Sequence, residues 1–187
     1  GCGYGGSCFP KDVSSLVRQG EAAGSVMRIA AAADVINHAQ RGEMADRLLR
    51  LWRDEGRDPS QCVVALWGMA FKPNTDDVRE APAVVMAQRL LRAGASVRAY
   101  DPQAAETGAA ELRDFPKFSL AESATAALRD ADALIVATEW REFSSIPVSQ
   151  VRQFMRGTLV FDGRSIFAPS AARAAGLRYH AFGRAHT

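Results

Sequence analysis

The chain has 187 residues, of which 48% are hydrophobic and 24% charged, and its formal net charge at pH 7 is +2. This length and composition are sufficient for one domain with a buried core plus a second, smaller element. Basic and acidic side chains are interspersed without a basic cluster, so we expect no nucleic-acid partner. No apolar run reaches the ~20 residues of a membrane-spanning helix, so we expect no membrane span.

The three cysteines, Cys2, Cys8 and Cys62, form no C-x-x-C pair and lie near no paired histidines in the sequence. This pattern predicts neither a disulfide framework nor a zinc or other metal site, and it favours a reducing, cytoplasmic compartment. The chain begins at Gly1, within what has the pattern of a functional loop and without an initiator Met. We therefore expect that an upstream part of the protein has been removed.

The opening stretch, GCGYGGSCFPKD, places glycines at positions 1, 3 and 6, the spacing G-x-G-x-x-G of a dinucleotide pyrophosphate loop. That fingerprint also requires a preceding strand and a following helix within one compact βαβ unit. No strand precedes Gly1, and the predicted helix that follows is succeeded by another helix. The glycines therefore do not predict a pyrophosphate loop. We interpret the loop instead as the segment that surrounds Cys8.

Cys8 lies just ahead of a predicted helix start at residues 10–13, where Pro10 suits a first turn. The helix N-terminus and the neighbouring Lys11 both favour the thiolate, which is the nucleophilic form. Asp12, one helical turn further, is either the N-cap of the helix or a carboxylate able to orient or deprotonate a water. A lone cysteine is also commonly a small buried side chain, and the residues alone leave both interpretations open.

Two helices are predicted next, over residues 13–22 and roughly 25–53. The second carries an apolar stripe in steps of three and four, which predicts one long amphipathic helix whose packing partner is another subunit or its own chain. The stripe consists of Val26, Ile29, Ala33, Ile36, Met44, Leu48 and Leu51. Gly42 weakens the middle of this helix. Asn37 and Gln40 lie beside the stripe, and we interpret them as buried polar joints rather than ligand contacts.

The polar stretch DEGRDPSQ at residues 54–61 predicts a domain boundary, with one part over residues 1–58 and another over 59–187. Beyond it, apolar strand patterns alternate with helical ones, which predicts an α/β fold with a Rossmann-like, doubly wound parallel sheet. The predicted strands cover 62–68, 96–101, 133–138, 158–162 and 177–182. The predicted helices cover 81–95, 121–131, 148–155 and 169–175.

Two predicted strands deliver cations to the edge where ligands bind in open parallel sheets, beyond the carboxyl ends of the strands. The first is followed by a loop that contains Lys72 and Arg79, and another ends in FDGR with Arg164. If both strands lie near the point where the strand order reverses, Lys72 and Arg164 converge on one crevice and suit an anionic ligand such as a diphosphate. The alternative is that each is a solvated loop charge.

The turn Gly68-Met69-Ala70 follows the first predicted strand and would let a backbone approach closely. Asp101, at the end of the second strand, resembles the acidic residue that holds a ribose in dinucleotide folds. Only one of the three usual glycines is present, at Gly68, so the sequence does not predict an ordinary NAD site in this domain.

Three blocks together resemble the UDP-glucose/GDP-mannose 6-dehydrogenase family: GYGGSCFPKD (3–12), FKPNTDDVREAP (71–82) and FDGR (161–164). The resemblance implies an N-terminal NAD-binding Rossmann domain, absent here, then a helical dimerisation region and a C-terminal Rossmann-like domain that holds the nucleotide sugar. This chain would carry the end of the dimerisation region and the whole C-terminal domain. Phe9 and the amino-acid sequences of the second and third blocks resemble the UDP-glucose branch of the family more than the GDP-mannose branch.

The resemblance also implies roles for particular residues. Cys8 would attack the aldehyde formed at the sixth carbon of the sugar of UDP-glucose, on the way to UDP-glucuronate, and Asp12 would help to activate the water that hydrolyses the thioester. The implied binding contacts are Tyr4, Gly5 and Gly6 through their backbone to the sugar, Lys72 and Arg164 to the nucleotide sugar, and Arg79 toward NAD. A catalytic lysine and asparagine are expected upstream of Gly1, so the chain alone should be inactive.

Several alternatives stay open from the sequence. The chain is expected to form a homodimer through the helix at 25–53, and it could be a non-catalytic dimerisation or nucleotide-sugar-binding module. It could also belong to a GDP-mannose or UDP-N-acetylmannosamine dehydrogenase of the same family. A further possibility is a redox-sensing thiol pair of Cys2 and Cys8.

Overall fold

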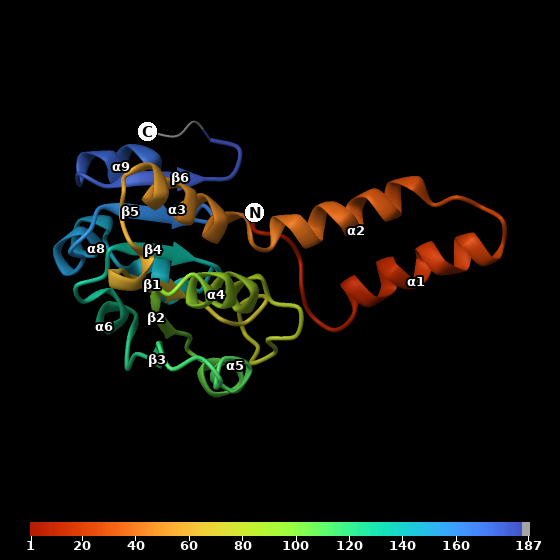
Figure 1. Ribbon diagram of the computed structural model, residues 1–187, viewed down its shortest axis with the longest axis horizontal. Helices are drawn as coiled ribbons and strands as arrows, with labels where there is room; N and C mark the ends of the chain where they lie inside the picture. Colours follow the sequence, from red (N-terminus) through yellow and green to blue (C-terminus); the bar gives the residue numbers. More distant parts are fainter. Residues whose placement is uncertain (185–187) are drawn as a thin grey trace.

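The computed structural model describes residues 1–184, so the last three residues of the part predicted over 59–187 lie outside the described residues. A hairpin of two helices projects from one side of a sheet covered by helices on both faces (Figure 1). The N-terminus lies where the hairpin joins the rest of the molecule. Within residues 1–184, no helix combines the length and apolar character needed to cross a membrane.

The projecting hairpin consists of α1 (Phe9–Ala22) and α2 (Arg28–Gln40), which pack against each other. Helix α1 includes the predicted helix at 13–22 and begins four residues earlier, because Pro10 occupies its first turn. Gly20 is buried where the side chain of Met27 crosses it, and a Cβ at this position would overlap that side chain. The hairpin is therefore closed by close packing just before its turn.

The prediction of one helix over 25–53 is wrong, because α2 ends at Gln40 and α3 (Glu43–Asp54) begins after a short break. Gly42 lies in this break, where its low helix propensity permits the interruption. The guanidinium of Arg89 occupies the space that a Cβ on Gly42 would fill, and it pairs there with Asp46 of α3.

The break divides the predicted apolar stripe between two environments. Met44 and Leu48 of α3 are fully buried in the core of the same chain. Val26, which precedes α2, and Ile29 and Ile36 within it are exposed to solvent. The two predicted packing partners were the chain itself and another subunit. The chain itself covers the second half of the stripe, and the first half is exposed to solvent.

The sheet within residues 1–184 has six parallel strands in the order β3-β2-β1-β4-β5-β6. The strands are β1 (Val63–Trp67), β2 (Ser96–Tyr100), β3 (Phe118–Leu120), β4 (Ala133–Val136), β5 (Leu159–Asp162) and β6 (Arg178–Ala181). The order reverses between β1 and β4, which makes this the switch point of a doubly wound sheet. The predicted α/β class and parallel sheet are confirmed.

The remaining helices include one 3₁₀ turn, η1 (Pro59–Gln61), and connect the strands. They are α4 (Pro82–Arg92), α5 (Ala105–Glu111), α6 (Ala124–Leu128), α7 (Arg141–Ser145), α8 (Val148–Phe154) and α9 (Pro169–Ala174). The sequence patterns did not predict α5, α7 or β3. Helix α7 and β3 are too short for a periodic signal, and the segment AETGAAE of α5 has no large apolar residue.

The core has two layers, one on each face of the sheet. Trp52 of α3 and Leu90 of α4 pack on one face, while Phe143 and Tyr179 pack with Trp67 on the other. Helix α3 therefore shares one core with the sheet, although it precedes the polar stretch at 54–61. The division of the chain between residues 58 and 59 stays a prediction.

A buried carboxylate ties the polar stretch at 54–61 to the sheet. Asp132, just before β4, accepts hydrogen bonds from Arg57 Nη2 (2.6 Å), Arg156 Nη2 (2.5 Å) and the Val63 amide (2.9 Å). Burial alone would raise the pKa of Asp132, but the hydrogen bonds from Arg156, Val63 and Arg57 outweigh it and hold the pKa below its ordinary value.

The turn after β1 is packed against β4. Gly68 has φ of +89°, and a Cβ there would lie 2.5 Å from Thr138 Oγ1 and 2.8 Å from the Thr138 nitrogen. The hydroxyl of Thr138 in turn donates to the Ala70 carbonyl at 2.6 Å. The close approach predicted at this turn is therefore made by the protein's own strand end and not by a ligand.

We expect Gly68→Ala to lower the free energy of unfolding by about 2–4 kcal/mol, because both the positive φ and the overlap with Thr138 oppose a side chain. Gly56→Ala is the matched control, since Gly56 has φ of +66° but nothing within 4 Å of a Cβ. Its free energy of unfolding should fall by only ~1–2 kcal/mol, the cost of a side chain at a positive φ. Urea unfolding of both variants measures the difference, and equal losses would contradict the packing argument.

Candidate functional site

Three segments meet at the carboxyl edge of the sheet: residues 1–8, called the Cys loop; residues 68–81 after β1, called the cation loop; and the turn at 162–164 after β5. The amide of Gly6 donates to the Arg79 carbonyl at 2.8 Å, joining the first two. Arg164 Nη2 donates to the Phe71 carbonyl at 3.3 Å, joining the last two. The structure thus brings the loops of Lys72 and Arg164 together, as the sequence predicts.

Cys8 occupies the N-cap position of α1 and is exposed, with its sulfur 3.7 Å from Ser7 Oγ. The interpretation of Cys8 as a buried packing residue is therefore wrong. The Asp12 amide donates to the Cys8 carbonyl at 2.8 Å, so Asp12 lies one helical turn beyond the thiol. Its carboxylate is exposed, 3.5 Å from Lys11 Nζ, and does not cap the helix, so its interpretation as the N-cap is also wrong.

Helix α2 holds the Cys loop by two amide side chains. Asn37 accepts from the Tyr4 amide (2.8 Å) and donates to the Tyr4 carbonyl (3.1 Å), and it is buried. Gln40 donates to the Gly1 carbonyl at 2.8 Å. A Cβ on Gly3 would come within 2.7 Å of Asn37 Oδ1, so this glycine makes room for the contact. The prediction of buried polar joints is confirmed for Asn37, whereas Gln40 makes a joint but is only half-buried.

The glycines at 5 and 6 pack against the cation loop. A Cβ on Gly5 would overlap the Glu80 carbonyl, and one on Gly6, at φ of +85°, would lie 2.9 Å from the Phe71 ring. Glu80 itself has φ of +55° and pairs with the buried Arg41 of the break between α2 and α3. Contact with the protein therefore accounts for both glycines, and their contact with a sugar stays a prediction.

The side chain of Tyr4 faces away from the cation loop. Its ring packs edge-on against Phe9 with centroids 4.7 Å apart, in a groove formed with Val13, Val26 and Met27. Its buried hydroxyl has no hydrogen-bond partner among the described residues, and burial, aided by the charge of Asp34, raises its pKa. Tyr4 therefore contributes to the Cys loop through its main chain and not through its ring.

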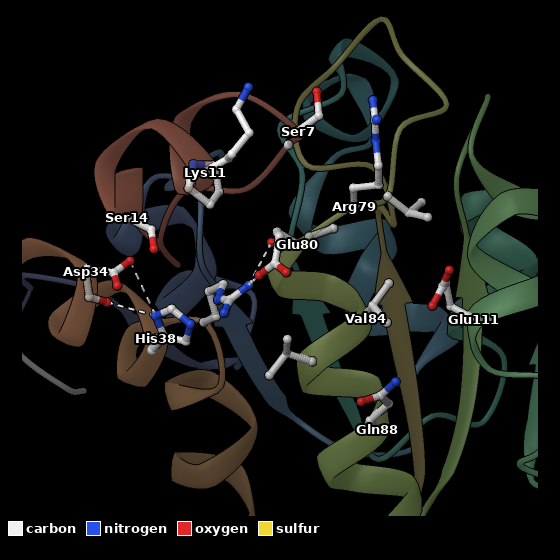
Figure 2. A pocket seen from close by; sticks show the side chains of 16 residues that line it. Ser7, Lys11, Ser14, Asp34, His38, Arg79, Glu80, Val84, Gln88 and Glu111 are labelled. Atoms are coloured by element: carbon white, nitrogen blue, oxygen red, sulfur yellow. Dashed lines mark hydrogen bonds and ion pairs between the residues drawn. The ribbon is translucent and has the colours of Figure 1, made fainter. Parts of the chain in front are cut away.

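A pocket of about 770 Å³ opens between the helical hairpin and α4 (Figure 2). Lys11 and Ser14 of α1, Asp34 and His38 of α2, and Gln88 of α4 contribute to its wall. The charges are of both signs, and Cys8 is not among the lining residues. The pocket lies beside the Cys loop rather than around the thiol.

Arg79, the predicted NAD contact, also lines this pocket (Figure 2). Its guanidinium makes a two-point contact with Asp77, with Nε at 2.9 Å from Oδ1 and Nη2 at 2.8 Å from Oδ2. These hydrogen bonds hold the pKa of Asp77 below its ordinary value. The fork of Arg79 is thus already occupied within its own loop, while the side chain as a whole remains exposed.

The two predicted substrate cations differ in how the protein holds them. Arg164 is half-buried and donates from Nε to the Ala137 carbonyl at 2.7 Å and from Nη2 to the Phe71 carbonyl. Its Nε also lies 3.1 Å from a carboxylate oxygen of Glu139. Lys72 is exposed, with Nζ 5.3 Å from the centroid of the Phe71 ring. Arg164 is therefore fixed in orientation, whereas Lys72 extends into solvent.

The sequence patterns missed Asp162 as the residue that shapes the turn of Arg164. Its buried carboxylate accepts from the amides of Arg164 and Phe167, both at 3.0 Å, and from the Tyr179 hydroxyl at 2.8 Å. Burial and this carboxylate raise the pKa of Tyr179. The D-G pair at a strand end was the available signal, because aspartate commonly accepts from the backbone two residues ahead.

Asp101 organises the strand ends instead of holding a ribose, which corrects the resemblance seen in its position. Within the described chain its buried carboxylate accepts five N–H groups. They come from Met69 (2.7 Å), Ala70 (3.1 Å), Gln103 (2.9 Å), Ala104 (2.7 Å) and Trp140 Nε1 (3.0 Å). The amides of the turn after β1 are thus unavailable to a dinucleotide phosphate, so this turn does not fit NAD.

The thiols at positions 2, 8 and 62 are all free. Cys2 is fully buried under the Cys loop, and its sulfur donates to the Ala137 carbonyl at 3.6 Å. Burial raises its pKa, although the charge of Arg164 acts in the opposite direction. Cys2 thus serves packing at the site, while Cys8 faces solvent, and this arrangement does not favour a redox pair.

Residues 65–169 match the UDP-binding domain of the UDP-glucose/GDP-mannose dehydrogenase family, and residues 1–39 match its central domain. The chain is 42% identical over 189 residues to a UDP-glucose 6-dehydrogenase of Pseudomonas aeruginosa, covering 98% of this chain and 41% of that protein. It is 37% identical to UDP-glucose 6-dehydrogenase YwqF of Bacillus subtilis, covering 98% and 40%. The chain therefore spans about 40% of the length of these curated relatives.

Two solved structures are similar over nearly the whole chain. A UDP-glucose dehydrogenase from Pyrobaculum islandicum has a TM-score of 0.78 at 37% identity, covering 96% of this chain and 38% of its own. A UDP-D-ManNAc dehydrogenase from Pyrococcus horikoshii has a TM-score of 0.80 at 27% identity, covering 98% and 40%. The arrangement of hairpin and sheet therefore recurs in solved proteins.

We expect Asn37→Ala to release the Cys loop, because it leaves the amide and carbonyl of Tyr4 without their partner. The free energy of unfolding should fall by about 1–3 kcal/mol. Cys2, buried in the parent chain, should then react with iodoacetamide, which mass spectrometry detects. Gln40→Ala is the control: it removes one bond to the exposed Gly1 and should leave Cys2 protected. Equal protection of Cys2 in both variants would contradict the role of Asn37.

Proposed function

The chain belongs to the UDP-glucose/GDP-mannose dehydrogenase family, and we propose that it supplies the cysteine loop and the UDP-sugar-binding domain of an NAD-dependent UDP-glucose 6-dehydrogenase. One observation carries the proposal: the exposed thiol of Cys8 lies on a loop that is docked on the cation loop, and Arg164 binds the same cation loop from the other side. The proposed nucleophile and the two cations proposed for the diphosphate thus belong to loops that meet at one edge of the sheet.

The proposed chemistry of this chain centres on Cys8. Its thiolate adds to the carbonyl carbon of the C6 aldehyde, and the oxygen takes a proton to give a thiohemiacetal. NAD, when bound, supplies the oxidising power. The oxidised sugar is then held on Cys8 as a thioester, and water attacks its carbonyl carbon to release the carboxylate and the thiol. Asp12, exposed one turn beyond the thiol, would take the proton from that water.

The nucleotide end of the substrate is assigned to Lys72 and Arg164. Arg164 presents a planar fork whose orientation two backbone carbonyls already hold, so little rotamer freedom is lost on binding a diphosphate. Lys72 is free to move and would add a second positive charge. The main chain of Tyr4, Gly5 and Gly6 would lie along the sugar. Arg79 would reach toward NAD after releasing or sharing Asp77.

Homodimer formation is proposed through α2 and the residues leading into it, rather than through one helix over 25–53. Val26, Ile29, Val35 and Ile36 are exposed by between 64% and 88%, an apolar surface that a soluble chain rarely leaves uncovered. The free thiols support the expected reducing, cytoplasmic location. The choice of UDP-glucose over a related sugar rests on the higher identity to UDP-glucose dehydrogenases, 37% against 27% among the solved structures.

We expect isothermal titration of the chain with UDP-glucose to show binding that Lys72→Ala and Arg164→Ala each weaken by about tenfold or more, since each removes a charge-assisted contact with the diphosphate. Lys117→Ala is the matched control, because Lys117 bonds the Ser60 and Gly94 carbonyls far from these loops. It should bind as the parent chain does. Absence of binding by the parent chain, or equal losses in all three variants, would contradict the assignment.

Alkylation of Cys8 provides a separate check on the cysteine loop. We expect iodoacetamide to modify Cys8 at neutral pH, because its thiol is exposed at the start of α1. UDP-glucose should slow this reaction, because its sugar covers the sulfur, whereas UDP should not. Mass spectrometry with Cys8→Ser as the blank follows the modification. A rate of modification that UDP-glucose leaves unchanged would favour the non-catalytic binding module, and equal effects of UDP and UDP-glucose would place the sugar elsewhere.

A further inference from the structure

An acidic residue follows the strand that lies between the two strands whose connections carry the cations. Lys72 follows β1, Glu139 follows β4 and Arg164 follows β5, and these three strands are neighbours in the sheet. The sequence of charges along the edge is therefore positive, negative, positive. The Glu139 side chain is 44% exposed, so it is not buried as part of the core. A diphosphate bound by Arg164 therefore lies close to this carboxylate, which is 3.1 Å from the guanidinium.

Glu139 contributes less to the orientation of the Arg164 guanidinium than two backbone carbonyls do. The single hydrogen on Arg164 Nε points to the Ala137 carbonyl at 2.7 Å, and Nη2 donates to the Phe71 carbonyl. The carboxylate of Glu139 lies 3.1 Å from the same Nε and forms an ion pair with it. Two backbone carbonyls on different strand ends thus orient the guanidinium, and the carboxylate adds its charge to a group that is already fixed.

We propose that Glu139 lowers the affinity of this edge for a diphosphate: it neutralises Arg164 in the ligand-free chain and repels the ligand when it binds. This inference rests on the proposed function, since the diphosphate is that of the UDP-sugar. Like charges a few ångströms apart near a protein surface oppose each other by an amount that salt screens. Glu139 thereby keeps binding weak enough for a charged product to leave.

The alternative role for Glu139 is to position Arg164, and the two roles predict changes of opposite sign. If the carboxylate held the guanidinium in place, its removal would weaken binding of a diphosphate. Because the Ala137 and Phe71 carbonyls remain, we expect the orientation of Arg164 to survive and the loss of repulsion to dominate.

The experiment is isothermal titration of Glu139→Gln with UDP, in parallel with the parent chain. We expect the variant to bind UDP about fivefold more tightly at about 0.01 M salt, where the screening length is about 30 Å, and the gain to shrink at about 1 M salt. Uridine, which has no phosphate, should bind both chains equally. Glu142→Gln is the matched control: Glu142 lies on α7 beside the Tyr100 hydroxyl, at 3.2 Å, and not beside Arg164.

Each outcome is decisive. A parent chain that binds no UDP overturns the proposed function, and the inference with it. A parent chain that binds UDP, with Glu139→Gln equal or weaker, overturns the inference alone. An equal gain in UDP affinity by Glu142→Gln also overturns the inference alone, because the effect is then one of net charge. Glu139→Ala, verified as folded by its thermal unfolding, should repeat the gain, since the proposal depends on the charge and not on the amide of Gln.

Discussion

The carboxyl edge of the sheet depends on the buried carboxylate of Asp101. Its two oxygens accept N–H groups from the turn after β1, from the segment after β2 and from Trp140 after β4. A buried charge is tolerated only when it is fully hydrogen-bonded, and here five donors satisfy it. Because those donors come from three separate connections, the carboxylate fixes the strand ends relative to one another. The cation loop leaves the sheet from this fixed base.

Glycines in this chain make room for other parts of the protein. Gly68 accommodates Thr138, Gly42 accommodates Arg89, and Gly5 accommodates the carbonyl of Glu80. In a dinucleotide fold, a glycine after the first strand permits approach of a phosphate. Here the same position is closed by the protein itself, through Thr138. The sheet therefore has the strand order of a doubly wound nucleotide-binding fold, but its first turn is filled by protein atoms.

Helix α2 connects the two halves of the site through opposite faces. Its inner face and the following break hold the Cys loop and the cation loop through Asn37, Gln40 and Arg41. Its outer face, with Ile29 and Ile36, is apolar and exposed. An element that covered this outer face would therefore contact the helix that holds the Cys loop. This gives a physical route by which assembly and the geometry around Cys8 could be linked.

The sequence by itself determined the α/β class, the parallel sheet and the edge at which the charges gather. Buried parallel strands read as continuous apolar runs, and parallel connections place all carboxyl ends on one side. It also predicted that a helix begins just beyond Cys8, because Pro10 and the following pattern are local signals. Short elements such as β3 and α7 left no periodic pattern, and this is why they were missed.

Only the tertiary structure decided the roles that depend on distant partners. From the sequence, Asp101 resembles a ribose ligand, because three of its five donors lie 31 to 39 residues away and leave no local pattern. The break at Gly42 depends on Arg89, which arrives from α4. The pairing of Glu139 with Arg164 likewise follows from strand order. Spacing along the chain predicts which groups reach the edge, while packing across the sheet determines which of them are already bound to each other.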